Sequence, residues 1–173
     1  MVLQAGTAFG NYRIVRLIGE GGFGQVYLAE NPLINRRAAI KILHPSMATD
    51  GELLRRFLNE ARAASAIHHP NIIEVFDAGG TAEGAPYILM EFLEGESLQA
   101  RLAKVGSLAL PRALDIANQA GSALAAAHSA GIVHRDLKPE NIFLGNIEQL
   151  FVKVLDFGIA KILEQDAKDK LTR

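Results

Sequence analysis

The sequence predicts an α+β protein, because strand-like and helix-like segments occupy different parts of the 173-residue chain. Residues 12–43 are rich in β-forming side chains with partial alternation, and they contain a run of glycines. Over residues 50–67 and again over 111–130, apolar side chains recur every three or four positions, which is the period of a helix. The expected architecture is a strand-rich first half joined through residues 93–96 to a helix-led second half.

Composition narrows the class of protein. Apolar residues make up 49% and charged residues 21% of the chain, which is ordinary for a globular protein that buries a core. The net charge of −1 gives no overall attraction to nucleic acid or to an anionic membrane. The chain has no cysteine, which excludes disulfides, thiolate catalysis and cysteine-based zinc sites.

The sequence shows no pattern typical of a membrane segment or of a secretory signal. No run of about 18 apolar residues occurs, so we expect no membrane segment in this chain. The first residues lack a basic segment followed by an apolar stretch, which argues against a secretory signal. We therefore expect a cytoplasmic location, with any membrane anchor of the full-length protein lying beyond residue 173.

The first half is expected to form a sheet. Strands are predicted at Tyr12–Ile18 and Gln25–Glu30, on either side of the glycines, and at Arg37–Leu43. Two further strands are predicted at Ile72–Phe76 and Pro86–Phe92. Because a strand follows the glycines directly, they belong to a hairpin between strands.

One helix is expected within this first half. The spacing of apolar residues predicts a helix over Asp50–Ile67, with Asp50 as its N-cap. The sequence His-His-Pro-Asn at 68–71 ends that helix, since proline cannot continue it.

The second half is expected to begin with helices and to end with strands. Ser97 is predicted to cap a short helix, and a long buried helix is predicted over Pro111–Ala130, closed by Gly131. Strands are predicted at Ile142–Leu144 and Leu150–Leu155. The apolar stripe of the long helix is expected to contain Ala113, Ile116, Ala117, Ala120, Leu124 and Ala127.

Residues 19–24 carry the pattern G-x-G-x-x-G. In a dinucleotide-binding fold this pattern lies between a strand and a helix, whereas here a strand follows Gly24. Two interpretations of the stretch itself stay open. It forms either a purely structural hairpin or a hairpin whose backbone N–H groups face a phosphate.

Lys41 and Glu60 are predicted to form an ion pair. Lys41 shares a strand face with Ala39 and Leu43, and a lone ammonium is costly to bury. Glu60 lies on the same helical side as Phe57, so its carboxylate also requires a partner. The alternatives are a lysine that protects an edge strand and a solvated glutamate.

The stretch GIVHRDLKPEN at 131–141 concentrates polar groups between two apolar elements. Asp136 could accept the proton of a hydroxyl, and Lys138 could neutralise a phosphoryl group in transfer. Asn141 offers a neutral oxygen ligand for Mg²⁺. Asp156, which ends the apolar strand in VKVLDFG, offers a carboxylate ligand. An ordinary polar loop and an ordinary turn are the alternatives for these two stretches.

Taken together, these pieces match the protein-kinase signature in type and order: a glycine loop, A-x-K, a helical glutamate, HRDLKPEN and DFG. From about Asn11 to its end, the chain resembles the eukaryotic-like Ser/Thr protein kinases, and most closely their bacterial branch. The resemblance implies a two-lobed fold after an N-terminal extension of residues 1–11. The kinase domain would span 12–173, with a complete N-lobe of antiparallel sheet plus one helix over about 12–92, a hinge at about 91–96 and only the first part of the helical C-lobe at 97–173.

The resemblance also implies an activity, which is Mg-ATP-dependent phosphoryl transfer to Ser or Thr hydroxyls of proteins. Asp136 would be the catalytic base, assisted by Lys138 and by Lys41 paired with Glu60. Asn141 and Asp156 would bind Mg²⁺. The nucleotide would contact Ile18, Gly19, Glu20, Gly21, Gly22, Phe23, Gly24, Val26, Ala39, Lys41, Met90, Glu91, Leu93 and Phe143.

Further roles follow from the same resemblance. His134 would pack below Phe157 without acting as an acid or base, and Arg135 would pair with a phosphate on the activation loop. Thr172 is the one Ser or Thr after the DFG stretch, which makes it the candidate phosphorylation site. The expected partners are ATP and protein substrates, with no nucleic acid, and a dimer of kinase domains is compatible with the family.

The chain departs from the family pattern at its end. It stops at Arg173, and no A-P-E stretch follows Asp156. We therefore expect an incomplete catalytic domain, cut within the activation segment, with little activity of its own and with uncovered apolar surface on the 111–130 helix. The alternative is a catalytically dead module that binds nucleotide or a partner kinase. A small-molecule phosphotransferase is disfavoured by Lys138-Pro139 and by Gly158.

Overall fold

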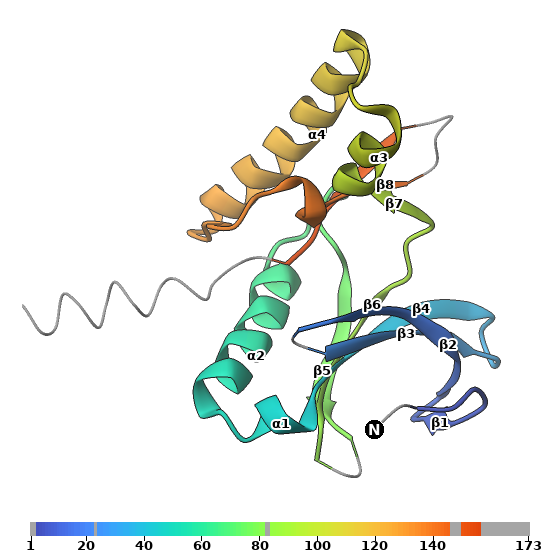
Figure 1. The fold of residues 1–173 in the computed structure, drawn as a ribbon. Helices are drawn as coiled ribbons and strands as arrows, with labels where there is room; N and C mark the ends of the chain where they lie inside the picture. The colour runs from blue at the N-terminus through green and yellow to red at the C-terminus, as the bar shows by residue number, and fades with distance from the viewer. Residues whose placement is uncertain (1–2, 23, 82–83, 146–149, 157–173) are drawn as a thin grey trace, which may run out of the picture. The chain divides into compact units, whose positions relative to one another are not determined.

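The computed structural model describes residues 3–22, 24–81, 84–145 and 150–156 (Figure 1). The chain divides into two compact units. Unit 1 consists of Met1–Ala61 and Glu74–Leu93, and unit 2 consists of Arg62–Ile73 and Glu94–Arg173. Among the described residues, no helix is both long enough and apolar enough to cross a membrane.

Unit 1 is built on an antiparallel sheet, which curls visibly in Figure 1. Within the described part of the chain it has six strands in the order β1-β2-β3-β4-β6-β5. The sequential order of β1 to β4 follows from tight connections between neighbouring strands. The strands are β1 (Ala8–Phe9), β2 (Tyr12–Gly21), β3 (Gly24–Asn31), β4 (Arg36–Leu43), β5 (Val75–Gly80) and β6 (Pro86–Glu91).

Apolar clusters lie on both faces of this sheet, and alternation along β4 shows how. Ala38 and Ile40 face a cluster that also contains Tyr27, against which Leu3 and Phe9 from the start of the chain pack. Leu43, at the end of β4, packs in a different cluster, with Phe57, Ala61 and Ile88. The sheet therefore carries one apolar layer under the N-terminal segment and another under a helix.

That helix is α2 (Gly51–Ala66), and the predicted cap is confirmed. The Asp50 carboxylate accepts the backbone N–H groups of Glu52 at 2.9 Å and Leu53 at 3.2 Å. A short helix that the sequence analysis did not predict, α1 (Pro45–Ala48), precedes it. Proline in the first turn of α1 has a preset φ and lacks only an N–H that a helix start leaves unused.

The predicted strand at Ile72–Phe76 is wrong in position. Ile72 is buried in unit 2, where it forms an isolated parallel bridge with Val154. The strand β5 begins at Val75 and continues to Gly80. Pairing with β6 sustains it, and the Tyr87 hydroxyl donates to the Asp77 carboxylate at 2.8 Å, so cross-strand contacts override the poor strand propensity of aspartate and glycine.

Unit 2 combines helices with an antiparallel sheet in the order β7-β8-β9. The sequence analysis missed β7, which lies at the junction that it placed at 93–96. Gly95 permits this pairing, because a Cβ there would lie 2.0 Å from the carbonyl oxygen of Leu144. The elements are β7 (Gly95–Ser97), α3 (Leu98–Val105), α4 (Leu110–Ser129), the 3₁₀ turn η1 (Pro139–Asn141), β8 (Ile142–Gly145) and β9 (Phe151–Val154).

The ends of α3 and α4 agree with their predicted signals. The Ser97 hydroxyl accepts the N–H of Ala100 at 3.1 Å and so caps α3. At the C-terminal end of α4, Gly131 has φ +73° and donates its N–H to the His128 carbonyl, while Ile132 donates its N–H to the Ala127 carbonyl. This pair of hydrogen bonds forms a Schellman cap, which favours glycine at its left-handed position.

The predicted stripe of α4 needs correction. The buried residues are Ile116, Ala120, Ala123 and Ala127, whereas Ala117 is exposed. The burial of a single stripe also means that α4 is not a fully buried helix. Two large apolar side chains near its start, Leu110 and Leu114, are 70% and 54% exposed.

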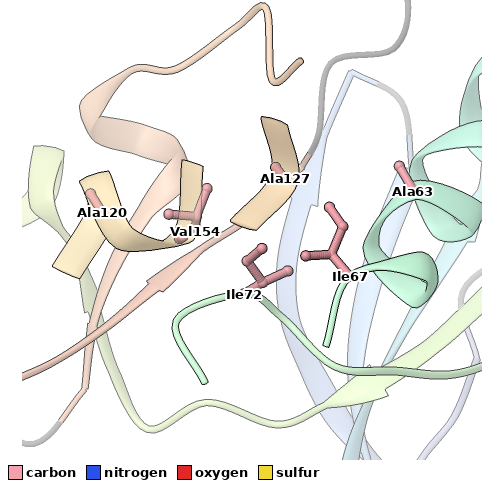
Figure 2. Close-up of a cluster of buried hydrophobic side chains, with 7 residues drawn as sticks. Ala63, Ile67, Ile72, Ala120, Ala127 and Val154 are labelled. Atoms are coloured by element: carbon pink, nitrogen blue, oxygen red, sulfur yellow. The ribbon is translucent and has the colours of Figure 1, made fainter. Parts of the chain in front are cut away.

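The core of unit 2 joins three segments that are distant in sequence (Figure 2). Ile67 and Ile72 flank the turn that follows α2, and they pack with Val154 of β9 and the alanines of α4. The alanines allow close approach of the helix backbone. This packing holds β9, which leads directly to Asp156, against the turn at 68–71.

Candidate functional site

The glycine run lies on a β-hairpin, as the sequence predicts. Gly19 pairs with Val26, and Gly21 pairs with Gly24. A Cβ on Gly24 would lie 2.0 Å from the carbonyl oxygen of Ile42, so the sheet itself requires glycine there. A Cβ on Gly21 or on Gly22 would meet no described atom within 4 Å, and neither residue has a positive φ. The fold therefore explains Gly24, and it leaves Gly21 and Gly22 as open backbone.

Lys41 and Glu60 form the predicted ion pair. The Lys41 ammonium lies 3.4 Å from a Glu60 carboxylate oxygen, and the two side chains are 18% and 24% exposed. On the sheet, Lys41 stands opposite Val26 of β3 and Ile88 of β6. Partial burial strengthens the attraction between the two charges, because the surrounding medium is less polar than water.

The other positions of unit 1 that the resemblance assigns to nucleotide lie on the same sheet or at its end. Ala39 is buried and pairs with Met90, two residues along β4 from Lys41. Glu91, the last residue of β6, donates its N–H to the Glu74 carbonyl at 2.9 Å, and its carboxylate accepts the Glu74 N–H at 2.8 Å. The remaining assigned positions here are Ile18, Glu20 and Leu93, while Phe23 falls outside the described residues.

In unit 2, the loop after α4 brings Asp136 and Lys138 together. The Lys138 ammonium lies 2.9 Å from an Asp136 carboxylate oxygen, and about half of each side chain is exposed. Hydrogen bonding to Asp136 and the charge of that carboxylate raise the pKa of Lys138, and the charges of Glu140 and Asp156 add to this effect. The site therefore offers an accessible carboxylate with a cation beside it.

Asn141 connects this loop to the residue before Asp156. Its side-chain N–H donates to the Asp136 carbonyl at 2.9 Å, and its own carbonyl accepts the N–H of Leu155 at 2.8 Å. Because the amide nitrogen is a donor, the amide oxygen of Asn141 is the atom that could bind a cation. The contacts hold Asn141 and the backbone leading to Asp156 in one hydrogen-bonded arrangement.

His134 is 2% exposed, and two contacts orient its ring. Its Nε2 lies 2.9 Å from the Leu155 carbonyl oxygen, which can only accept, so Nε2 carries the hydrogen. Its Nδ1 lies 3.4 Å from the backbone N–H of Asp136 and acts as the acceptor. His134 is thus a buried side chain that positions the loop; its expected neighbour Phe157 lies outside the described residues.

Two residues of this region have unusual backbone conformations. Arg135 has φ +63° and Asp156 has φ +44°, values that residues other than glycine adopt at a cost in free energy. Such strain is concentrated at functional sites. The Arg135 atom Nη1 is also buried without a hydrogen-bond partner among the described residues, which suits an anion. Thr172, the expected phosphorylation site, falls outside the described part of the chain.

The choice of metal ligands is narrow. In the described ranges, no group of three or more His, Cys, Asp or Glu side chains is arranged to hold a metal ion. The resemblance assigns Mg²⁺ to Asn141 and Asp156, and this cation takes few protein ligands and draws the rest from phosphates and water. Phe143, the last assigned nucleotide contact, is half-buried on β8, where it pairs with Ser97 and Lys153.

The sequence analysis missed three polar side chains that support β9. The Asn71 amide donates to the Val152 carbonyl at 2.8 Å and to the Gln119 amide oxygen at 2.9 Å. Gln119 in turn accepts the Val152 N–H at 2.9 Å, and the buried Lys153 ammonium donates to the Ile72 carbonyl at 3.0 Å. A signal was available, because Gln119 interrupts the apolar stripe of α4 one residue before Ala120.

Comparison with known proteins agrees with this arrangement. The model of the protein kinase domain family matches residues 12–173. The chain is 48% identical over 162 residues to the serine/threonine-protein kinase Pkn1 of Myxococcus xanthus, and 46% identical over 154 residues to PrkC of Bacillus subtilis. These alignments cover 92% and 89% of the chain but only 23% of each relative.

A solved structure shows the same fold. The crystal structure of the Mycobacterium tuberculosis PknI kinase domain superposes with a TM-score of 0.78 at 34% sequence identity, and the match covers 91% of this chain and 64% of that one. The chain spans about a quarter of the length of the two curated relatives above. On the family match, the sequence identity and the fold, the chain belongs to the protein kinase family, among relatives that are bacterial serine/threonine-protein kinases.

Proposed function

We propose that the protein containing this chain transfers the γ-phosphoryl group of Mg-ATP to Ser or Thr hydroxyls of other proteins. The observation that carries this proposal is the half-exposed Asp136 carboxylate, 2.9 Å from the Lys138 ammonium and anchored through its backbone by Asn141. It supplies an acceptor for a proton and a cation for a phosphoryl group in one place. Names of relatives support the same reaction, because they are serine/threonine-protein kinases.

Each group has a defined part in the transfer step. The Asp136 carboxylate orients the substrate hydroxyl and accepts its proton. The hydroxyl oxygen forms a bond to the γ-phosphorus while the bond from that phosphorus to the β,γ-bridging oxygen breaks, and ADP leaves with the electron pair. Lys138 offsets negative charge on the transferring group. The Asp136 carboxylate raises the pKa of Lys138, so this neighbour favours the charged form that the part requires.

Nucleotide binding would depend mainly on unit 1. We propose that Lys41, oriented by Glu60, binds the α- and β-phosphates, and that open backbone at Gly21 and Gly22 lets the phosphates approach closely. Adenine would contact Val26, Ala39, Met90, Glu91, Leu93 and Phe143, with the remaining assigned residues of the hairpin covering the phosphates.

Asn141 and Asp156 are the side chains that would hold Mg²⁺. One is a neutral amide and the other a carboxylate, which is a donor set that this cation accepts when phosphate oxygens complete its shell. When bound, Mg²⁺ supplies positive charge to the phosphates during transfer. The hydrogen bonds of Asn141 to Asp136 and Leu155 position its side chain for that role. Since ATP is the proposed donor, we also propose a cytoplasmic location.

The test is transfer of labelled γ-phosphate to a generic protein substrate by the purified full-length protein that contains this chain. Asp136→Asn should lower kcat by about 10²- to 10⁴-fold, because the proton acceptor is lost. Affinity for Mg-ATP, measured separately by calorimetry, should change little. Asp115→Asn, at an exposed position of α4, is the matched control and should leave the rate unchanged.

Two outcomes would contradict the proposal. An Asp136→Asn variant with the rate of the unmodified protein would remove Asp136 from the chemistry. Tight binding of Mg-ATP without any transfer by the unmodified protein would instead favour a kinase-like module that only binds nucleotide. Lys41→Met distinguishes the nucleotide half of the proposal, since it should weaken both binding and transfer.

A further inference from the structure

Unit 1 contains a cavity of about 490 Å³, and none of its described lining residues is assigned to nucleotide, metal or catalysis. It lies at one end of the sheet, where β3 begins, β4 ends and the β5–β6 connection turns. Its volume falls within the range of sites that bind small molecules. A molecule bound in this cavity would therefore be a ligand other than the nucleotide.

Among the described residues, no Asp, Glu, Lys or Arg side chain lines this cavity. The polar side chains of the described lining are an amide, three hydroxyls and an imidazole, from Gln25, Tyr27, Thr49, Thr81 and His44. An ionised ligand would lose hydration without gaining a counter-charge there. The apolar side chains of the lining, besides the Tyr27 ring, are Leu3, Ile42, Leu43, Pro45, Ala48 and Ala85.

Gln25 provides a polar anchor at the wall of the cavity. It is 7% exposed, accepts the Tyr27 hydroxyl at 2.6 Å and donates to the Glu20 carboxylate at 3.0 Å. A primary amide has two N–H donors and two acceptor positions, so these bonds use one of each. The amide can therefore also bond to a hydroxyl or an amide group of a ligand.

We propose that this cavity binds a small, uncharged, mainly apolar molecule that carries one hydroxyl or amide group. The apolar body of the ligand lies against the apolar lining, and its polar group bonds to Gln25. The same Gln25 side chain bonds to Glu20 across the glycine hairpin, so an occupied cavity contacts the residue that braces the hairpin. The proposal does not depend on kinase activity, because it concerns binding to unit 1.

The first test uses 2-naphthol as the probe and naphthalene-2-sulfonate as its permanently anionic counterpart. Calorimetry on the purified protein should give a Kd of about 1 mM or lower for 2-naphthol, in line with the affinity that a ligand of this size can reach. The sulfonate should bind at least about tenfold more weakly, because the described lining offers no Lys or Arg side chain to pair with it. Absence of 2-naphthol binding, or equal affinity for the two probes, would overturn the proposal.

The second test locates the probe. In ¹⁵N-labelled protein, 2-naphthol should shift the amide resonances of Gln25, Thr49 and Ala85. Shifts confined to Ala39 and Met90 would place the probe at the nucleotide positions and overturn the proposal.

The third test fills the cavity. Ala48→Phe should weaken 2-naphthol binding at least about tenfold, because the new ring occupies the space of the ligand. Ala117→Phe, at an exposed position of α4, is the matched control and should leave the affinity unchanged. If circular dichroism shows that the Ala48 variant is unfolded, Ala85→Leu replaces it. Unchanged affinity in a folded filling variant would contradict the proposal.

Discussion

The two halves of the candidate site are held by different kinds of interaction. In unit 1, Lys41 and Ala39 occupy regular positions on a strand, and the register of the sheet decides where they lie. In unit 2, Asp136 and Asn141 lie on a loop and a single 3₁₀ turn, held by side-chain hydrogen bonds and strained backbone. We therefore expect the stability of unit 1 to be more sensitive to steric intrusion than to loss of a single polar group, and the stability of unit 2 to show the reverse.

The largest expected effect comes from steric intrusion into unit 1. Gly24→Ala would place a methyl group 2.0 Å from the Ile42 carbonyl oxygen, and the backbone would have to move. We expect a loss of about 3 kcal/mol or more in the free energy of unfolding, measured by urea denaturation. A change below about 1 kcal/mol would mean that the end of the hairpin is much less rigid than its register implies.

Gly21→Ala is the matched control in the same hairpin. Its methyl group would meet no described atom within 4 Å, so the free energy of unfolding should change by only about 0.5 kcal/mol. Affinity for Mg-ATP should nevertheless fall, since the methyl group would enter the space that we assign to phosphate. Unchanged affinity would favour the interpretation of the glycines as a purely structural hairpin.

Loss of a polar group should be most costly in unit 2. Asn71→Ala removes the hydrogen bonds to the Val152 carbonyl and to the Gln119 amide oxygen, so the buried Val152 carbonyl loses a donor. We expect a loss of about 2–3 kcal/mol in the free energy of unfolding. Asn118→Ala, at an exposed position of α4, controls for the same chemical change and should have little effect. Similar losses in the two variants would show that Asn71 does not support β9.

A polar deletion in unit 1 should have a smaller effect. Tyr27→Phe keeps the buried ring but removes a hydroxyl that donates to Gln25 and accepts the Leu3 N–H. We expect a loss of about 1 kcal/mol in the free energy of unfolding. Amide hydrogen exchange should also become faster at Leu3. Tyr12→Phe is the control, because Tyr12 packs on the same cluster and no described hydrogen bond involves its hydroxyl.

The difference between the halves also explains what could be predicted from sequence. The hairpin, the Lys41–Glu60 pair and the cap at Asp50 follow from local periodicity and residue type, and the structure confirms them. Strand β7 could not be predicted in this way, because its pairing with β8 joins residues almost fifty positions apart. The same applies to the correct start of β5, which depends on its partner β6.

In unit 2, the residue types of the loop were visible in the sequence, but the contacts that hold them were not. The Leu155 N–H donates to the Asn141 carbonyl, and the Leu155 carbonyl bonds to the His134 ring, so these contacts connect segments whose pairing no local pattern specifies. Likewise, Asn71 looked like part of a helix-ending turn, whereas its main role is to support β9. The roles of the site residues in binding and transfer stay predictions.

The smallest expected effect concerns the charge pair of the loop. The pKa of Lys138 is raised above its ordinary value of 10.5, and the hydrogen bond to Asp136 is the largest cause. A raised folded-state pKa means that the pair stabilises the fold below the ordinary lysine pKa and that this contribution is lost as pH rises through the folded-state pKa. Asp136→Asn should therefore move the pKa of Lys138 down towards its ordinary value, which NMR titration of the lysine side chain can measure.

The same titration separates an ion pair from a general effect of the loop. Glu140 and Asp156 also raise the pKa of Lys138, so Glu140→Gln should lower it by less than Asp136→Asn does. Because the Asp136 and Lys138 side chains are about half exposed, added salt should weaken the shift caused by Asp136. An equal response to both substitutions would mean that the overall charge of the loop, and not a bond to Asp136, sets the pKa of Lys138. The part of the candidate site in unit 2 would then lack its proposed geometry.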